Sequence, residues 1–249
     1  FVAEEAAESA PLDKNYVGPK NDYWHRVIER KPVRMLVFSF ILVAVGGIIE
    51  FIPTFLVKSN VPTIASVKPY TPLELHGRDV YIKEGCYTCH SQMIRPFRDE
   101  VARYGEYSKA GEHVYDHPFQ WGSKRTGPDL AREGAKYPDS WHYNHMYEPQ
   151  SMSPGSIMPS YPWLFKNEID LNKTESMIWA MRKVGVPYEK GYEKIANADL
   201  KKQNDEILKA LKADKIEAKA NTEIIALIAY LQRLGTDIKG EAKTAAATN

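Results

Sequence analysis

The feature that most constrains how this chain can fold is one long apolar run, MLVFSFILVAVGGIIEFIPTFLV, from Met35 to Val57. As an α-helix the run would be about 34 Å long, whereas the hydrocarbon core of a bilayer is about 30 Å thick. Glu50 is the one ionisable residue inside it. The run therefore predicts a helix that crosses a membrane.

The charges that flank the run predict its orientation. Basic residues are concentrated before it and are sparse after it: Arg26, Arg30, Lys31 and Arg34 precede, and Lys58 and Lys68 follow. Under the positive-inside rule the N-terminus is cytoplasmic and everything after residue 58 is extracytoplasmic. A cleaved signal peptide is the alternative, but the run is longer than a usual signal core, and no convincing small-residue cleavage site follows it. We expect an uncleaved anchor.

Composition excludes several classes of protein. There are 33 Lys and Arg against 32 Asp and Glu, so the net charge of +1 gives no sign of a nucleic-acid partner. Two cysteines are too few for a disulfide scaffold, and a hydrophobic fraction of 43% is enough to bury a core.

Composition shifts divide the chain into four predicted segments. These are a polar cytoplasmic arm (1–33), the transmembrane helix (34–58), a Pro-rich linker (59–72) and a domain with a helical C-terminal extension (73–249). Within the last, residues 95–166 are rich in Gly, Pro, Trp and Tyr and show no sustained period. Such a composition is typical of a segment that wraps a ligand.

Helical periodicity brackets that middle stretch. One helix is predicted from Leu73 into the cysteines, and others over 172–185, 198–219 and 221–235. The last has Asn221 or Thr222 as a plausible N-cap and Gly235 as a C-cap. The predicted fold class is therefore all-α.

Both cysteines lie in one motif, Cys86-Tyr87-Thr88-Cys89-His90. C-x-x-C-H is the attachment signature of c-type haem, in which the two thiols form thioethers and the histidine supplies an axial nitrogen. A zinc site would need a second ligand pair, and a thioredoxin-like pair would need a βαβ context that the chain lacks. A plain disulfide leaves His90 unexplained. We therefore predict one covalent haem c.

The second axial ligand has several candidates. Met93 is too close to His90 in sequence, whereas Met146, Met152 and Met158 all lie at a workable distance. Met158 is favoured, because the Pro-rich loop SIMPSYPWLF would present its thioether rigidly. The alternative is a second histidine, His142 or His145, which would give a centre of lower potential. We expect these two histidines, in SWHYNHMY, to pack or to form hydrogen bonds near the haem instead.

The anchor carries small and polar residues on one predicted face: Ser39, Val43, Gly46, Glu50 and Pro53 or Thr54. An ionisable side chain inside a bilayer is costly unless it meets protein or water. The anchor is therefore expected to dock against a polytopic membrane partner.

The same features occur together in a known family. An anchor, C-x-x-C-H, GPDL at 127–130, a Met-Pro loop and a final IAYLQRLG helix resemble a membrane-anchored class I cytochrome c. Residues 89–142, together with GGIIEFIP and MPSYPWLF, more specifically resemble the monohaem subunit II of cbb3-type cytochrome c oxidases, the CcoO/FixO family. The resemblance implies an anchored, extracytoplasmic class I cytochrome c-like domain in a bacterial inner membrane.

The resemblance also implies roles for individual residues. Cys86 and Cys89 would hold the haem, and His90 and Met158 would ligate its iron. The Pro128 carbonyl would accept a hydrogen bond from His90. The basic residues Arg95, Arg98, Lys124 and Arg125 are candidates to face the haem propionates; the alternative is that they are solvated or face a partner. Trp121 is expected to pack against the haem.

The function that the resemblance implies is electron transfer within an oxidase. The haem would pass electrons from a c-type cytochrome, either a donor or another subunit, to a polytopic haem–copper catalytic subunit that reduces oxygen. No oxygen chemistry is expected on this chain. The alternatives are the cytochrome subunit of nitric oxide reductase, a free-standing membrane-tethered electron shuttle and a haem-based sensor, which copurification with an oxidase core would discriminate.

Overall fold

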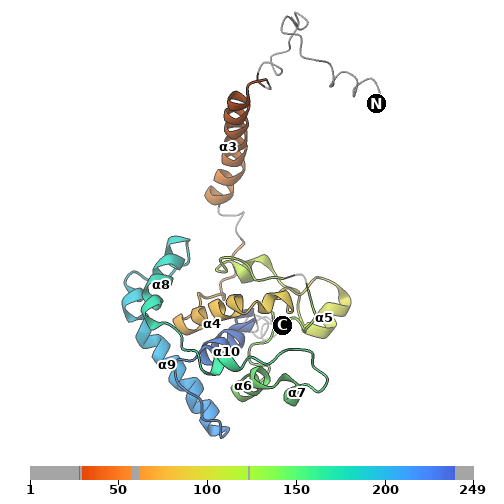
Figure 1. Cartoon of the computed structure of the whole chain (residues 1–249), viewed down its shortest axis with the longest axis vertical. Coiled ribbons are helices and arrows are strands. Elements are labelled where there is room, and N and C mark those ends of the chain that lie inside the picture. Colours follow the sequence, from red (N-terminus) through yellow and green to blue (C-terminus); the bar gives the residue numbers. More distant parts are fainter. Residues whose placement is uncertain (1–27, 29, 58–61, 123, 239–249) are drawn as a thin grey trace, which may run out of the picture. The chain divides into compact units, whose positions relative to one another are not determined.

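The computed structural model describes residues 28, 30–57, 62–122 and 124–238 (Figure 1). Most of the predicted arm 1–33 and the start of the linker 59–72 therefore lie outside the described residues. The described part is helical and contains no β-strand, and one isolated antiparallel bridge joins Glu168 to Thr222. The predicted all-α class is confirmed. By contacts, the chain divides into two units, Phe1–Asn60 and Val61–Asn249.

The first unit contains helix α3 (Pro32–Leu56). It begins with a proline, whose missing N–H costs nothing in the first turn of a helix. The segment Pro32–Thr54 is long and apolar enough to span a membrane, with 23 residues and a mean hydropathy of 2.5. None of the described side chains of α3 is buried. An apolar surface of this extent needs a bilayer or a protein partner to cover it, as the sequence predicts.

The core of the second unit is the crossing of α4 (Pro72–Lys83) and α10 (Glu223–Arg233). Helix α4 starts with a capping box, in which the Thr71 side chain and Glu74 satisfy each other's backbone N–H groups. Helix α10 is buried on all sides from Glu223 to Leu231, as expected of a central helix. The two helices approach so closely that a Cβ on Gly77 would lie 1.9 Å from the Ala226 carbonyl oxygen.

Helices α8 (Thr174–Lys183) and α9 (Tyr192–Ala213) flank this core (Figure 1). The helix predicted over 198–219 thus begins and ends earlier than expected. It ends in a Schellman motif: Lys215 has a φ of 62°, its N–H donates to Lys212 O at 3.0 Å, and Ile216 N–H donates to Leu211 O at 2.9 Å. The bonds that end the helix are local, but the polar sequence around them gave no signal for its position.

The middle of the chain forms short helices joined by irregular backbone. In order these are η2 (Cys86–Thr88), α5 (Arg98–Tyr104), η3 (Ala110–His113), α6 (Asp139–Tyr147), α7 (Pro149–Met152), η4 (Pro162–Phe165) and η5 (Leu171–Lys173). Helix α6 packs on both α10 and α9. These segments bring residues that are far apart in the sequence to the end of α4, where the cysteine motif lies.

Candidate cofactor pocket

The cysteine motif forms a tight turn directly after α4. Gly85 ends the helix with a φ of 70°, and the His90 N–H donates to the Cys86 carbonyl at 2.9 Å. Both cysteines are free thiols; Cys86 is partly buried and Cys89 is exposed. Burial raises the pKa of the Cys86 thiol to about 12, so this sulfur is protonated at neutral pH.

A cavity of about 370 Å³ opens beside this turn, within the roughly 300–1,000 Å³ typical of cofactor sites. Both cysteines and His90 lie on its wall, as does Met158 from the Met-Pro loop. The rest of the wall is largely apolar and includes Leu130, Met146, Leu227 and Leu231. The structure thus brings four sequence-predicted residues, from two distant segments, around one space.

The GPDL segment lies against the His90 ring. His90 Nδ1 is 2.8 Å from the Pro128 carbonyl oxygen. Because a carbonyl only accepts, Nδ1 carries a proton, and in the neutral imidazole Nε2 is the nitrogen with the free lone pair. A Cβ on Gly127 would lie 2.2 Å from His90 Cε1, so only glycine allows the loop to approach this closely. The loop therefore fixes both the position and the tautomer of the imidazole.

The loop that carries Met158 is tied at both sides. The Met158 N–H donates to Ser156 Oγ at 3.2 Å, and the Tyr161 N–H donates to the Met146 carbonyl at 2.9 Å. Met146 belongs to the buried core, and neither Met93 nor Met152 is among the described residues on the wall. Two methionines thus line the cavity, of which Met158 is the one that lies in a loop.

Helix α6 adds two imidazoles to the wall. His142 is 1% exposed, and His145 lies one turn further along the same helix. Burial lowers the pKa of His142 to about 4 and also lowers that of His145. Both rings are therefore neutral at pH 7 and face the cavity without a positive charge.

Comparison with family models identifies the family of the chain. The family model described as "Cytochrome C oxidase, mono-heme subunit/FixO" matches residues 25–238. The chain belongs to this family. It is thus a mono-haem subunit of a cytochrome c oxidase, as the resemblance of its sequence to subunit II of cbb3-type oxidases predicts. A search of the curated proteins finds no match.

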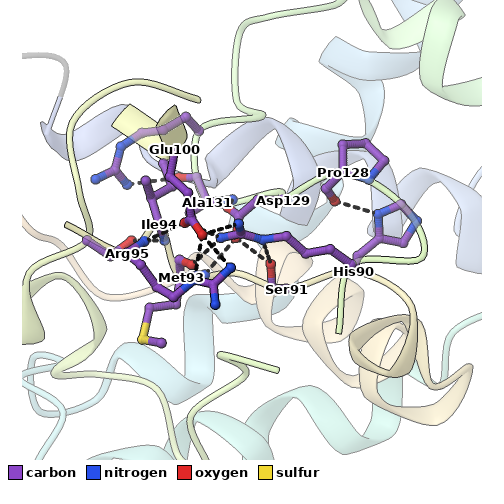
Figure 2. A network of polar contacts seen from close by, with 12 residues as sticks. His90, Ser91, Met93, Ile94, Arg95, Glu100, Pro128, Asp129 and Ala131 are labelled. Atoms are coloured by element: carbon purple, nitrogen blue, oxygen red, sulfur yellow. Dashed lines mark hydrogen bonds and ion pairs between the residues drawn. The ribbon is translucent and has the colours of Figure 1, made fainter. Parts of the chain in front are cut away.

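The two arginines predicted to face the haem propionates, Arg95 and Arg125, both pair with a carboxylate of the protein itself. Figure 2 shows the His90–Pro128 hydrogen bond and, beside it, a polar network that includes Asp129, Arg95 and Glu100. Arg125 binds the Glu100 carboxylate through two nitrogens, each at 2.7 Å, and Arg95 pairs with the same carboxylate. Neither guanidinium is among the described groups that line the cavity.

The physical reason for this pairing is that the Glu100 carboxylate is buried, so its negative charge needs positive groups next to it. It is 4% exposed, and the Arg125 guanidinium, followed by contacts from Arg95, lowers its pKa to about 2. Both arginines are therefore engaged with a carboxylate of the protein itself. The sequence shows the opposite charges within this stretch but not which of them pair.

Asp129 joins two segments of the chain that are far apart in the sequence. Its carboxylate accepts hydrogen bonds from the Ser91 hydroxyl at 2.6 Å and from the Met93 N–H at 3.0 Å, just after His90. It also accepts one from the Ala131 N–H at 2.8 Å, just after Pro128. Asp129 thus ties together the segments that carry the two partners of the His90–Pro128 bond.

Trp121 also lies away from the described wall of the cavity. Its ring stacks on Phe119 with 4.7 Å between centroids, and its edge contacts His113. Its backbone carbonyl accepts from the Gln92 N–H at 2.6 Å. The residue therefore supports the segment behind the cysteine motif instead of contacting the space beside it.

Proposed function

We propose that this subunit relays single electrons through one covalently bound haem c, from a c-type cytochrome to the haem–copper subunit of the oxidase. The observation that carries the proposal is the grouping of Cys86, Cys89, His90 and Met158 on one cavity wall. When bound, the haem supplies reversible one-electron transfer at its iron.

The residues present fit this group. Two free thiols, spaced as in C-x-x-C-H, are available to form thioethers with the haem vinyl groups. The Pro128 carbonyl accepts from His90 Nδ1, so Nε2 is the nitrogen of the neutral imidazole that is available to a metal, and the hydrogen bond makes the imidazole a stronger donor. Met158 supplies the thioether of a His–Met pair. The close approach of Gly127 limits the space on one side of the ring.

The protein around the cavity limits access of water. Apolar side chains from α10 and from the GPDL segment, among them Leu227, Leu231 and Leu130, form much of the wall. A low local dielectric and a rigid ligand set reduce the reorganisation that accompanies a change in charge. The chain therefore serves as a fixed relay, and the reduction of oxygen belongs to the catalytic partner.

The anchor supports membership of a membrane complex. We infer that α3 packs on the polytopic catalytic subunit, with the N-terminus cytoplasmic and the haem domain outside the inner membrane. Glu50 lies on the apolar helix, and its backbone carbonyl accepts from the Thr54 hydroxyl at 3.0 Å. Contact with a protein partner or with water would offset the cost of a carboxylate at this depth.

The test combines mass spectrometry with optical spectra of the full chain in detergent. The wild-type protein should carry the added mass of one haem that resists acid extraction, and a ferric spectrum with the charge-transfer band of Met ligation. Met158→Ala should lose that band and keep the haem. Met152→Ala, a matched change in a nearby helix, should keep both. Absence of covalent haem from the wild-type chain would contradict the proposal.

Copurification separates this function from its rivals. A complex that contains haem b and copper is expected. A non-haem iron partner would instead indicate the cytochrome subunit of a nitric oxide reductase, and a chain that purifies alone with an intact haem would indicate a tethered shuttle.

A further inference from the structure

Helix α6 leaves two buried nitrogens of the cavity wall without hydrogen-bond partners. In the described residues, the buried side-chain N and O atoms that lack a partner are Ser66 Oγ, His113 Nε2, Trp121 Nε1, His142 Nε2 and His145 Nδ1. Only the last two belong to residues that line the cofactor cavity. A buried polar group without a partner is unfavourable, so two on one wall call for a ligand that pairs with them.

The two imidazoles are held in place by an aromatic stack. Trp141 lies between Tyr137 and His145, with centroids 4.1 Å and 4.5 Å away and rings nearly parallel. The His142 ring meets Trp141 edge-on at 5.3 Å. The two rings are therefore held in position before any ligand binds, as in a preorganised binding site.

The charged groups on the wall are acidic and would repel an anion. Glu84 and Glu133 line the cavity, and no Lys or Arg is among the described residues that do so. Arg95 and Arg125, which were predicted to face the propionates, pair with Glu100. A ligand with carboxylates must therefore find its donors among neutral N–H and O–H groups, and the unpaired imidazoles are the buried ones.

We propose that His142 and His145 donate hydrogen bonds to the carboxylates of the haem and so anchor its propionate side. This inference rests on the proposed function, because it takes haem as the occupant of the cavity. Pairing relieves two costs at once, since a carboxylate inside an apolar wall and an orphaned buried nitrogen are each unfavourable alone. Neutral donors leave the charge of the propionates in place, close to the iron.

The experiment uses the full-length holoprotein and resonance Raman spectroscopy. The bending modes of haem propionates lie at a higher frequency when the carboxylates are hydrogen-bonded. His142→Phe and His145→Phe keep an aromatic ring and remove the N–H groups, so each should shift a propionate band to lower frequency. His142→Gln and His145→Gln retain an N–H donor and should restore part of the shift.

His113→Phe is the matched control, because His113 also has an unpaired buried nitrogen but lies outside the wall. It should leave the propionate bands unchanged. If a Phe variant does not accumulate, a Leu substitution at the same position removes the same N–H from a smaller side chain.

Unchanged propionate bands in the double Phe variant, with haem content and the Met charge-transfer band intact, would overturn the inference and leave the proposed function standing. Loss of low-spin six-coordinate haem in either variant would also overturn it, because that histidine would then be an axial ligand. Failure of the proposed function would look different, since the wild-type chain itself would then carry no covalent haem.

Discussion

Removing the Asp129 carboxylate tests how the protein holds the His90–Pro128 hydrogen bond. The Asp129 side chain is fully buried, and Asp129→Ala would leave the N–H groups of Met93 and Ala131 without their acceptor. The Ser91 hydroxyl can rotate to another partner, and Arg125 keeps its pairing with Glu100. The main cost is therefore two unsatisfied backbone donors.

The structure sets the size of this effect. At about 1–3 kcal/mol for each unsatisfied donor, the loss of stability should be about 2–6 kcal/mol. For a domain of this size a loss of about 3 kcal/mol lowers the melting temperature by about 6–12 °C. Thermal unfolding followed by circular dichroism measures it. Asp129→Asn, which keeps one acceptor oxygen, should lose less.

The functional consequence is a higher reduction potential. If Asp129 no longer ties the two segments together, the Pro128 carbonyl moves away from His90, and with His90 as the proposed axial ligand the imidazole would become a weaker donor to ferric iron. Potentiometric titration gives the potential, and the g-values of the ferric haem in electron paramagnetic resonance report the state of the axial imidazole.

Asp116→Ala is the control for lost stability. Asp116 is also buried, 3% exposed, and pairs with Arg78 and His113 away from the cofactor cavity. It should destabilise the domain and leave the haem signals unchanged. If Asp129→Ala and Asp116→Ala lose similar stability while the potential and g-values of both match the wild type, Asp129 does not hold the His90–Pro128 hydrogen bond in place.

Three further predictions concern packing and pH. Gly127→Ala places a Cβ 2.2 Å from His90 Cε1, so haem staining of gels should show a several-fold loss of attached haem; full attachment would contradict it. Gly77→Ala places a Cβ 1.9 Å from the Ala226 carbonyl oxygen, and no side-chain rotation relieves this clash. Chemical denaturation should therefore show a free energy of unfolding that is lower by about 3 kcal/mol or more. Because a hydrogen bond from the neighbouring guanidinium lowers the pKa of Glu100 from 4.5 to about 2, its contribution to stability is full above pH 4.5 and is lost as the pH falls towards 2. Acid titration of Glu100→Gln should show a flatter loss between these values, and a curve identical to the wild type would argue against the pairing.

Several elements follow from local sequence alone. The apolar run requires a membrane or a partner whatever the rest of the chain does, and it forms helix α3. The motif around Cys86 and Cys89 places two thiols and an imidazole within one turn of backbone, because adjacency in sequence is adjacency in space at this range. Helix α10 likewise follows from its apolar period and the glycine after it.

Other features depended on which distant segments meet. The sequence made Arg95 and Arg125 candidates to face the haem propionates, whereas in the structure both pair with the buried carboxylate of Glu100. Similarly, the sequence predicts His142 and His145 as alternative ligands, packing residues or hydrogen-bonding groups, whereas their unpaired nitrogens depend on the position of α6 on the cavity wall.

The division has a physical cause. Local pattern determined the anchor, the cysteine turn and the central helix, because these depend on hydrophobicity and on bonds within a few residues. Tertiary structure alone decided which charges pair and which donors remain free. Burial removes water as a partner, so each buried polar group takes whichever partner the packing of distant segments brings within reach, and that choice leaves no periodic trace in the sequence.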